Sequence, residues 1–154
     1  MDPDDYGYDF LVTPVQVAED YPEELSSRFE IAKYKVEVKT TTTGEPRLTP
    51  LQALTCANEP DTFVLCVVDL RNFPDDVHQV AWTTENVSPL CRLLAGTHIP
   101  IRETLSFVQD AEGSDVPIRN VTALRYAVRP GIWEAGMDFD EWIESAFAVS
   151  EPTG

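Results

Sequence analysis

Glu37 and Lys39 stand two residues apart in the stretch VEVKTT, residues 36–41, where valines separate the charges. Side chains alternate across a β-strand, so both charges would point to the same face of a strand. Burying an ion without compensation costs several kcal/mol, and a divalent cation removes that cost for a carboxylate. We therefore expect Glu37, the backbone carbonyl of Val38 and Asp9 of the preceding strand to hold Mg²⁺, with Mn²⁺ as a possible substitute.

Lys39 supplies the second half of this chemistry. An ammonium group beside a metal site can orient or deprotonate an attacking water and stabilise charge that develops on a phosphate. The pattern therefore predicts hydrolysis of a phosphodiester. We expect Lys39→Ala to abolish cleavage and leave folding intact, on the assumption that the ammonium makes no core contact. The competing interpretation is that Glu37 and Lys39 are ordinary charges on a solvated strand face and that Asp9 is a turn residue after Gly7.

The elements that would position these residues are predicted from the first half of the chain. Alternating and β-branched patterns predict strands within residues 6–18 and 29–40. Thr49, Pro50 and Gln52 form a capping-box pattern that starts a helix over residues 50–58. The apolar run TFVLCVVDL, residues 62–70, predicts a buried central strand. The resulting β-α-β order predicts an α/β fold with a mixed central sheet flanked by helices.

The second half of the chain is less regular. We expect a capped helix over residues 88–96, exposed loops over 97–120, a strand over 121–130 and an amphipathic helix over 138–149. A length of 154 residues suits a single domain over residues 1–154, with its core in 6–70 and additional strands and helices in 71–150.

Four motifs in order resemble the PD-(D/E)XK nuclease superfamily, and within it the Mrr-like and NO VEIN C-terminal-like branch. They are GYDF (7–10), VEVKTT (36–41), RLTPLQA (47–53) and FVLCVVD (63–69). The resemblance covers about residues 6–70. It implies a restriction-endonuclease-like core, Asp9 and Glu37 as metal ligands, Lys39 as the catalytic lysine and Gln52 as an auxiliary polar group. The family core usually begins with a helix before the Asp strand, so either the chain is a fragment of a longer protein or another element fills that place.

Charge is the strongest global feature of the sequence. There are 27 acidic and 11 basic residues, a formal net charge of −16. This composition argues against a broad phosphate-binding face, since nucleic-acid affinity depends on clustered Lys and Arg. Three explanations remain open: mimicry of a polyanion, a basic partner elsewhere, or a salt-loving organism, which we favour. Only scattered arginines stand out: Arg28, Arg47, Arg71, Arg125 and Arg129.

The cysteines and the N-terminal residues indicate where in the cell the protein is expected. Cys56, Cys66 and Cys91 lie in apolar contexts with no metal-binding spacing, which predicts buried free thiols. The N-terminus is acidic where a signal peptide would be basic, and apolar runs are too short to span a membrane. We expect a cytoplasmic protein that does not enter a membrane.

These observations predict a metal-dependent DNA endonuclease in a restriction or defence system. Its partners would be DNA and a protein partner or a covalently linked upstream domain, in a homo-oligomer or a larger complex. The alternative is a non-catalytic acidic interaction domain, either a degenerate nuclease fold or a DNA mimic. An RNA-processing nuclease is a third interpretation, because the Asp9, Glu37 and Lys39 trio does not select the sugar.

Overall fold

The computed structural model describes residues 6–17, 28–30, 33–73 and 82–148. Within them the chain forms strands, helices and single 3₁₀ turns in the following order: β1 (Phe10–Val12), β2 (Val15–Val17), β3 (Arg28–Glu30), β4 (Tyr34–Thr41), β5 (Arg47–Leu48), α1 (Pro50–Asn58), β6 (Phe63–Asp69), α2 (Thr84–Val87), η2 (Ser88–Leu90), β7 (Cys91–Ala95), η3 (Gly96–His98), α3 (Ile101–Glu112), η4 (Val121–Ala123), β8 (Tyr126–Ala127), α4 (Pro130–Trp133) and α5 (Phe139–Ala148). No helix of these described ranges is both long and apolar enough to cross a bilayer.

The central sheet has four strands in the order β1-β4-β6-β7. β4 runs parallel to β6, while β1 and β7 pair antiparallel with β4 and β6 respectively. The sheet is therefore mixed, and the parallel pair β4 and β6 is connected through α1, as the β-α-β order predicts. β6 is buried from Phe63 to Val68, which confirms the predicted central strand. Apolar side chains on both faces of β6 explain why its sequence is apolar throughout rather than alternating.

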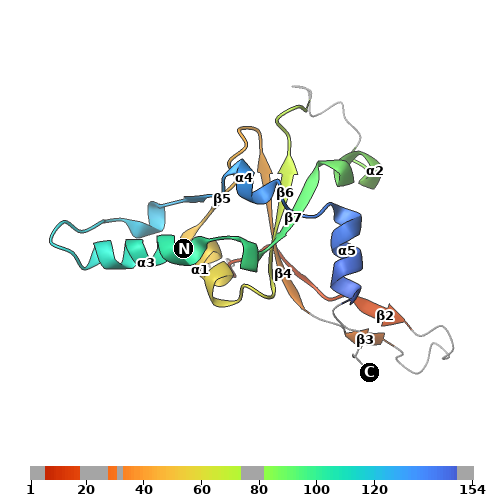
Figure 1. Ribbon diagram of the computed structural model, residues 1–154, viewed down its shortest axis with the longest axis horizontal. Coiled ribbons are helices and arrows are strands. Elements are labelled where there is room, and N and C mark those ends of the chain that lie inside the picture. The colour runs from red at the N-terminus through yellow and green to blue at the C-terminus, as the bar shows by residue number, and fades with distance from the viewer. Residues whose placement is uncertain (1–5, 18–27, 31–32, 74–81, 149–154) are drawn as a thin grey trace.

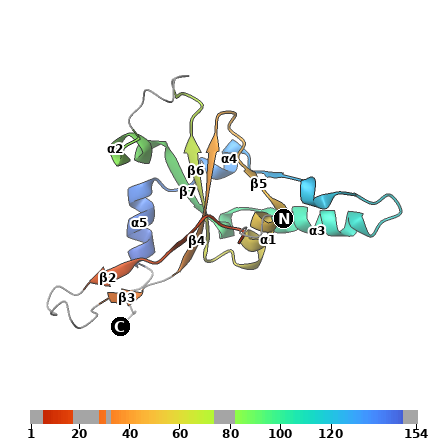
Figure 2. The same ribbon diagram turned by 180° about the vertical axis from the view of Figure 1, so that it is seen from behind.

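Two hydrophobic layers cover the sheet. On one face, Phe63, Leu65 and Val67 of β6 pack in a cluster with α1, α3 and Trp133 of α4. On the other face, Val64 and Cys66 pack in a second cluster with Ala146 and other residues of α5. Figures 1 and 2 show α1 and α3 on one side of the sheet and α5 on the opposite side. The α/β class with flanking helices is thus confirmed.

The start of α1 forms as its sequence predicts. The Thr49 side chain accepts a hydrogen bond from the backbone N–H of Gln52, and the Gln52 side chain accepts one from the backbone N–H of Thr49. Pro50 occupies the first helical position, where its missing N–H costs nothing. The reciprocal bonds satisfy two donors that a helix start leaves open. They also hold the Gln52 side chain in one orientation, toward the sheet.

Three predicted strands are divided or shorter than expected. The strand expected over residues 29–40 is found as β3 and β4, and residues 31–32 between them lie outside the described ranges. The segment 6–18 contains β1 and β2 rather than one strand. Within 121–130 only Tyr126–Ala127 is a strand, after a 3₁₀ turn.

Two further predictions in the second half were wrong. Residues 88–96 do not form a helix: η2 is followed by strand β7, whose Leu93 and Leu94 face opposite hydrophobic layers. Pairing with β6 outweighs the local helix-start signal, because it buries both faces of this segment. Residues 97–120 contain α3 rather than only loops. Its apolar positions Ile101, Leu105 and Val108 follow a helical spacing. They pack against the hydrophobic cluster on the face of the sheet that α1 covers, which we call the α1-side cluster.

Candidate functional site

Glu37 is a buried carboxylate on the face of the sheet that α1 covers. Its side chain is 1% exposed, although β4 also contains two lysines and two threonines. Gln52 of α1 donates a hydrogen bond from Nε2 to Glu37 Oε1 over 2.6 Å, and Gln52 is itself buried. This burial excludes the interpretation of Glu37 as an ordinary charge on a solvated face. A buried carboxylate requires compensation, and the amide of Gln52 supplies part of it.

Lys39 supplies the compensating charge. Its Nζ lies 2.8 Å from Glu37 Oε1, and its side chain is 23% exposed. The two residues share a face of β4, as their spacing predicts. The expectation that the Lys39 ammonium makes no core contact was wrong, because Glu37 is part of the buried interior. Lys39 therefore has a structural role in addition to any chemical one.

Asp9 reaches β4 from the neighbouring edge of the sheet. Its backbone N–H donates to the carbonyl of Val36 over 3.0 Å, and its Oδ2 accepts from the backbone N–H of Val38 over 2.8 Å. Asp9 thus binds the main-chain groups on both sides of Glu37, one residue before β1 begins. Asp9 lies in the bend that follows Gly7 rather than within the preceding strand as expected, and its carboxylate is exposed.

Gly7 makes this approach of Asp9 possible. It adopts φ of +78°, a conformation that side chains disfavour. A Cβ at this position would lie 2.3 Å from Thr55 Oγ1 and 3.1 Å from the carbonyl oxygen of Leu51, both on α1. The N-terminal segment therefore crosses α1 in contact with its backbone, and only glycine permits this path toward β4.

The donor set formed by Asp9, Glu37 and the Val38 backbone fits Mg²⁺ in its chemistry. All three offer hard oxygen atoms, and Mg²⁺ in proteins is commonly held by one or two carboxylates with water completing its shell. No group of three or more His, Cys, Asp or Glu side chains in the described ranges is arranged to hold a metal ion by itself. The site is therefore compatible with a partly hydrated cation and not with an all-protein cage.

A second ionic cluster, which the sequence did not reveal, lies at the far end of β4 and β6. Arg71 donates to Asp69 over 2.8 Å and to Glu134 over 2.7 Å, and its guanidinium stacks 5.0 Å from the ring centre of Trp133. The hydrogen bonds from Arg71 lower the pKa of Asp69. Trp133 in turn donates from Nε1 to the carbonyl of Gly44, in the turn that follows β4.

This cluster gives Asp69 a structural role. Asp69 of β6 pairs in register with Thr41 of β4, and Thr41 lies four residues after Glu37. Its carboxylate is held by Arg71 beside α4, so Asp69 fixes a turn and is not among the contacts of Glu37. A partner 63 residues away, such as Glu134 for Arg71, leaves no local pattern in the sequence.

All three cysteines are buried and free, as predicted. Cys66 and Cys91 lie on adjacent strands, and the hydrogen bond from the Cys66 thiol lowers the pKa of Cys91 to about 7. Burial raises the pKa of Cys56 to about 11. His98 is exposed in η3, and His78 lies outside the described residues.

Comparison with known proteins returns no protein-family model, no curated protein and no solved structure that matches this chain. A functional assignment therefore rests on the residues and on their geometry.

Proposed function

We propose that this protein is a metal-dependent endonuclease that hydrolyses phosphodiester bonds of DNA. The observation that carries this proposal is the buried Glu37 carboxylate, which contacts both the Lys39 ammonium and the Gln52 amide. Asp9, anchored to the same strand, provides the second carboxylate. An interior carboxylate and a partly exposed lysine on one strand face, with an acid at the neighbouring strand end, match the arrangement that metal-assisted hydrolysis requires.

The roles of the residues follow from their exposure and contacts. Asp9, Glu37 and the Val38 carbonyl would hold Mg²⁺, which when bound lowers the pKa of a water and polarises a phosphoryl oxygen. Lys39, the partly exposed member of the group, orients the attacking water and stabilises negative charge on the phosphate. Gln52 is a positioning residue, because it holds Glu37 Oε1 while its own side chain is fixed by the capping box.

The proposal extends to the fold family and to the setting. The connection of β4 through α1 to the parallel strand β6 supports a restriction-endonuclease-like core within the PD-(D/E)XK superfamily. A role in restriction or defence, as part of an oligomer or larger complex, is proposed from the same resemblance.

Net charge favours a second candidate function. A formal charge of −16 suits an acidic interaction domain that binds a basic, DNA-handling protein. In that case the Glu37–Lys39–Gln52 group would only stabilise a nuclease-like scaffold. The two candidates differ in whether the protein binds a divalent cation and cleaves DNA.

Plasmid nicking with Mg²⁺ or Mn²⁺ tests the proposal. We expect nicking that EDTA abolishes and that Lys39→Met reduces by about 100-fold or more, the usual cost of removing one group that stabilises transition-state charge. Lys35→Met is the matched control, because Lys35 lies on the same strand but pairs with the exposed Glu59. Circular dichroism confirms that each variant is folded.

Calorimetric titration with Mg²⁺ gives a readout independent of cleavage. Binding should be measurable in the wild type and lost in Glu37→Gln. Nicking by Lys39→Met at the wild-type rate would refute the assigned role of Lys39. A wild-type protein that neither binds a divalent cation nor nicks DNA, but binds a basic partner, would favour the interaction domain.

A further inference from the structure

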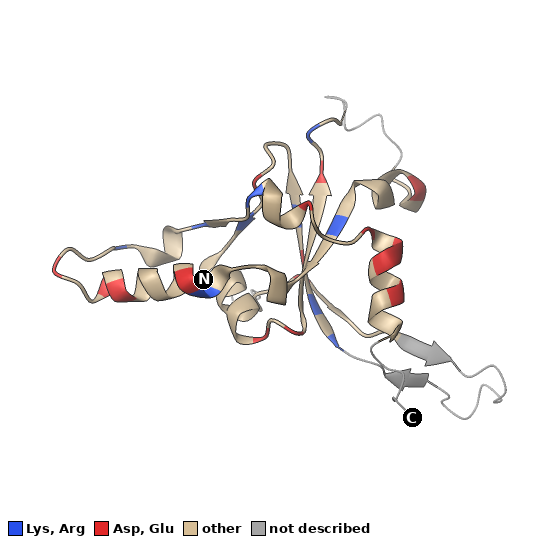
Figure 3. Cartoon of the chain, viewed as in Figure 1, with Lys and Arg blue, Asp and Glu red and all other residues tan. Residues whose placement is uncertain are grey.

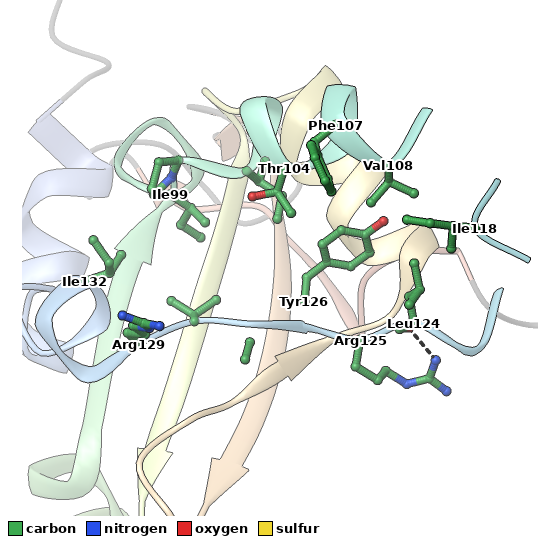
Figure 4. A pocket seen from close by; sticks show the side chains of 14 residues that line it. Ile99, Thr104, Phe107, Val108, Ile118, Leu124, Arg125, Tyr126, Arg129 and Ile132 are labelled. Carbon is green, nitrogen blue, oxygen red and sulfur yellow. Dashed lines mark hydrogen bonds between the residues drawn. The ribbon is translucent and has the colours of Figure 1, made fainter. Parts of the chain in front are cut away.

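The two-stranded ribbon of β5 and β8 has one buried and one exposed face. Arg47 pairs with Ala127, and Leu48 pairs with Tyr126. Leu48, Tyr126 and Val128 are buried in the α1-side cluster. Figure 4 shows Tyr126 pointing toward α3 and Arg125 pointing away from that helix.

Alternation along this ribbon places three arginines on its exposed face. Arg125 and Arg129 lie two residues before and after Ala127, and Arg47 lies opposite Ala127 on the partner strand. All three arginines are exposed, and so is Ala127. The extended backbone continues through Arg129, where the N–H of Val128 donates to the carbonyl of Pro46. We call Arg47, Arg125 and Arg129 the arginine stripe.

Within the described ranges, no ion pair with a carboxylate neutralises the positive charge of any of the three arginines. Arg125 donates only to the main-chain carbonyls of Thr122 and Leu124, as far as the described residues show. Arg71 differs, since its guanidinium binds two carboxylates. Glu45 is the acid that lies nearest to Arg47 along the chain, two residues before it.

Acidic residues are concentrated elsewhere. Helix α3 carries Glu103, Asp110 and Glu112, and α5 carries Asp140, Glu141 and Glu144. Figure 3 shows acidic positions on these helices and basic positions along the extended segments that flank α3. Glu112 is the α3 acid that acts on the ribbon, since burial and this carboxylate together raise the pKa of Tyr126. Tyr126 lies on the buried face, opposite the arginines, and at physiological salt the Debye length is about 8 Å, so acids farther away are largely screened from a ligand on the exposed face. A local cationic stripe can therefore attract a polyanion in spite of the net charge of −16.

The ribbon is also attached directly to the candidate site. Arg47 is followed by Leu48 and by Thr49, the cap of α1, and the Gln52 side chain links that cap to Glu37. A rise of about 3.4 Å per residue puts Arg125 and Arg129 about 14 Å apart, which spans about four phosphates of one strand of duplex DNA.

The three arginines lie on one face of the ribbon, are exposed, and form no ion pair within the described ranges. We infer that the arginine stripe binds the phosphate backbone of duplex DNA. The inference rests on the proposed function, because it supplies the substrate-holding surface of that same site. Contacts to phosphate oxygens carry no sequence information, so the contribution of the stripe is independent of sequence. The stripe holds the duplex on the ribbon that Thr49 and Gln52 connect to Glu37.

Fluorescence anisotropy with a labelled duplex of about 30 base pairs tests this inference, and EDTA prevents cleavage during the measurement. The duplex is about seven times as long as the estimated span of the stripe, so it covers all three arginines. The variant is Arg47→Gln/Arg125→Gln/Arg129→Gln. The control, Thr97→Glu/Ser106→Glu/Gln109→Glu, changes the net charge equally at exposed positions outside the ribbon. Each phosphate contact contributes about −0.9 to the slope of log affinity against log salt concentration. Loss of three contacts therefore predicts that, between about 50 and about 200 mM salt, the wild-type affinity falls about 40-fold more than the affinity of the arginine variant.

The control should keep the wild-type salt slope. An arginine variant with the wild-type slope overturns the inference, and so does the absence of duplex binding in the wild type. Poly-glutamate serves as a probe for an acidic protein partner, and preference for it over the duplex also overturns the inference. An RNA duplex of the same sequence distinguishes the two sources of phosphate, and equal or tighter binding of RNA would overturn the assignment to DNA. Duplex binding through the stripe by a protein that does not nick DNA would leave this inference standing and remove the proposed catalytic function.

Discussion

Replacing Lys39 by methionine tests how far the buried Glu37 depends on its cation. Two unit charges at the 2.8 Å separation of Lys39 Nζ and Glu37 Oε1 attract by about 6 kcal/mol at a dielectric of about 20, and by about 1.5 kcal/mol in water. The lysine side chain is 23% exposed, so the value must be discounted for screening. We expect Lys39→Met to lower the free energy of unfolding by about 2–3 kcal/mol, which leaves most proteins folded.

A double-mutant cycle separates this pair from other effects of the substitutions. Glu37→Gln keeps the volume of the side chain and an oxygen that can accept from Gln52. The double variant Glu37→Gln/Lys39→Met should be more stable than the sum of the single effects predicts, by about 2 kcal/mol. Denaturant unfolding at constant salt measures all four proteins. Thermal melting should show Lys39→Met about 4–12 °C below the wild type.

The exposed pair of Lys35 and Glu59 is the internal reference for this cycle. Its nitrogen–oxygen distance is 2.6 Å, but the side chains are 24% and 48% exposed. We expect its coupling energy to stay below about 1 kcal/mol, because solvent screens it. A coupling between Glu37 and Lys39 no larger than this reference would refute the conclusion that the lysine compensates a buried charge.

Two further predictions concern the approach to the site and the buried thiols. Gly7→Ala should lower the free energy of unfolding by more than about 1 kcal/mol, because of its positive φ and tight contact with α1. Gly131→Ala, with open space around its Cβ, should not, and equal melting temperatures would contradict the prediction. NMR titration of the Cys91 Cβ resonance needs no reagent access to the buried thiol and should be nearly complete above about pH 8, since the Cys66 thiol lowers the pKa of Cys91 to about 7. The Cys56 resonance, with a pKa of about 11, should still report the thiol form at that pH, and coincident titration curves would refute this.

Local signals in the sequence were sufficient for part of the fold. The bounds of α1 follow from Thr49, Pro50 and Gln52, because a capping box is made by residues three apart. The buried strand β6 follows from an uninterrupted apolar run. The shared face of Glu37 and Lys39 follows from the two-residue period of a strand. Each of these features is decided by neighbours within a few residues.

Other features required the tertiary structure. The segment that becomes β7 has a helix-like start, and only its pairing with β6 decides its conformation. α3 was missed although Ile101, Leu105 and Val108 have helical spacing, so that signal was present in the sequence. The partners of Arg71 come from segments far apart in the chain, and no local pattern connects them.

The sequence by itself determined which groups are available for chemistry: two carboxylates, one lysine and one amide on predictable elements. The tertiary structure decided that Glu37 is buried, that Gln52 and Lys39 contact the same oxygen, and that Asp9 binds the backbone beside it. It also decided that arginines 78 residues apart, Arg47 and Arg125, share one exposed face. The physical reason is that burial and charge pairing depend on distances in space, which chain connectivity restricts only over short separations.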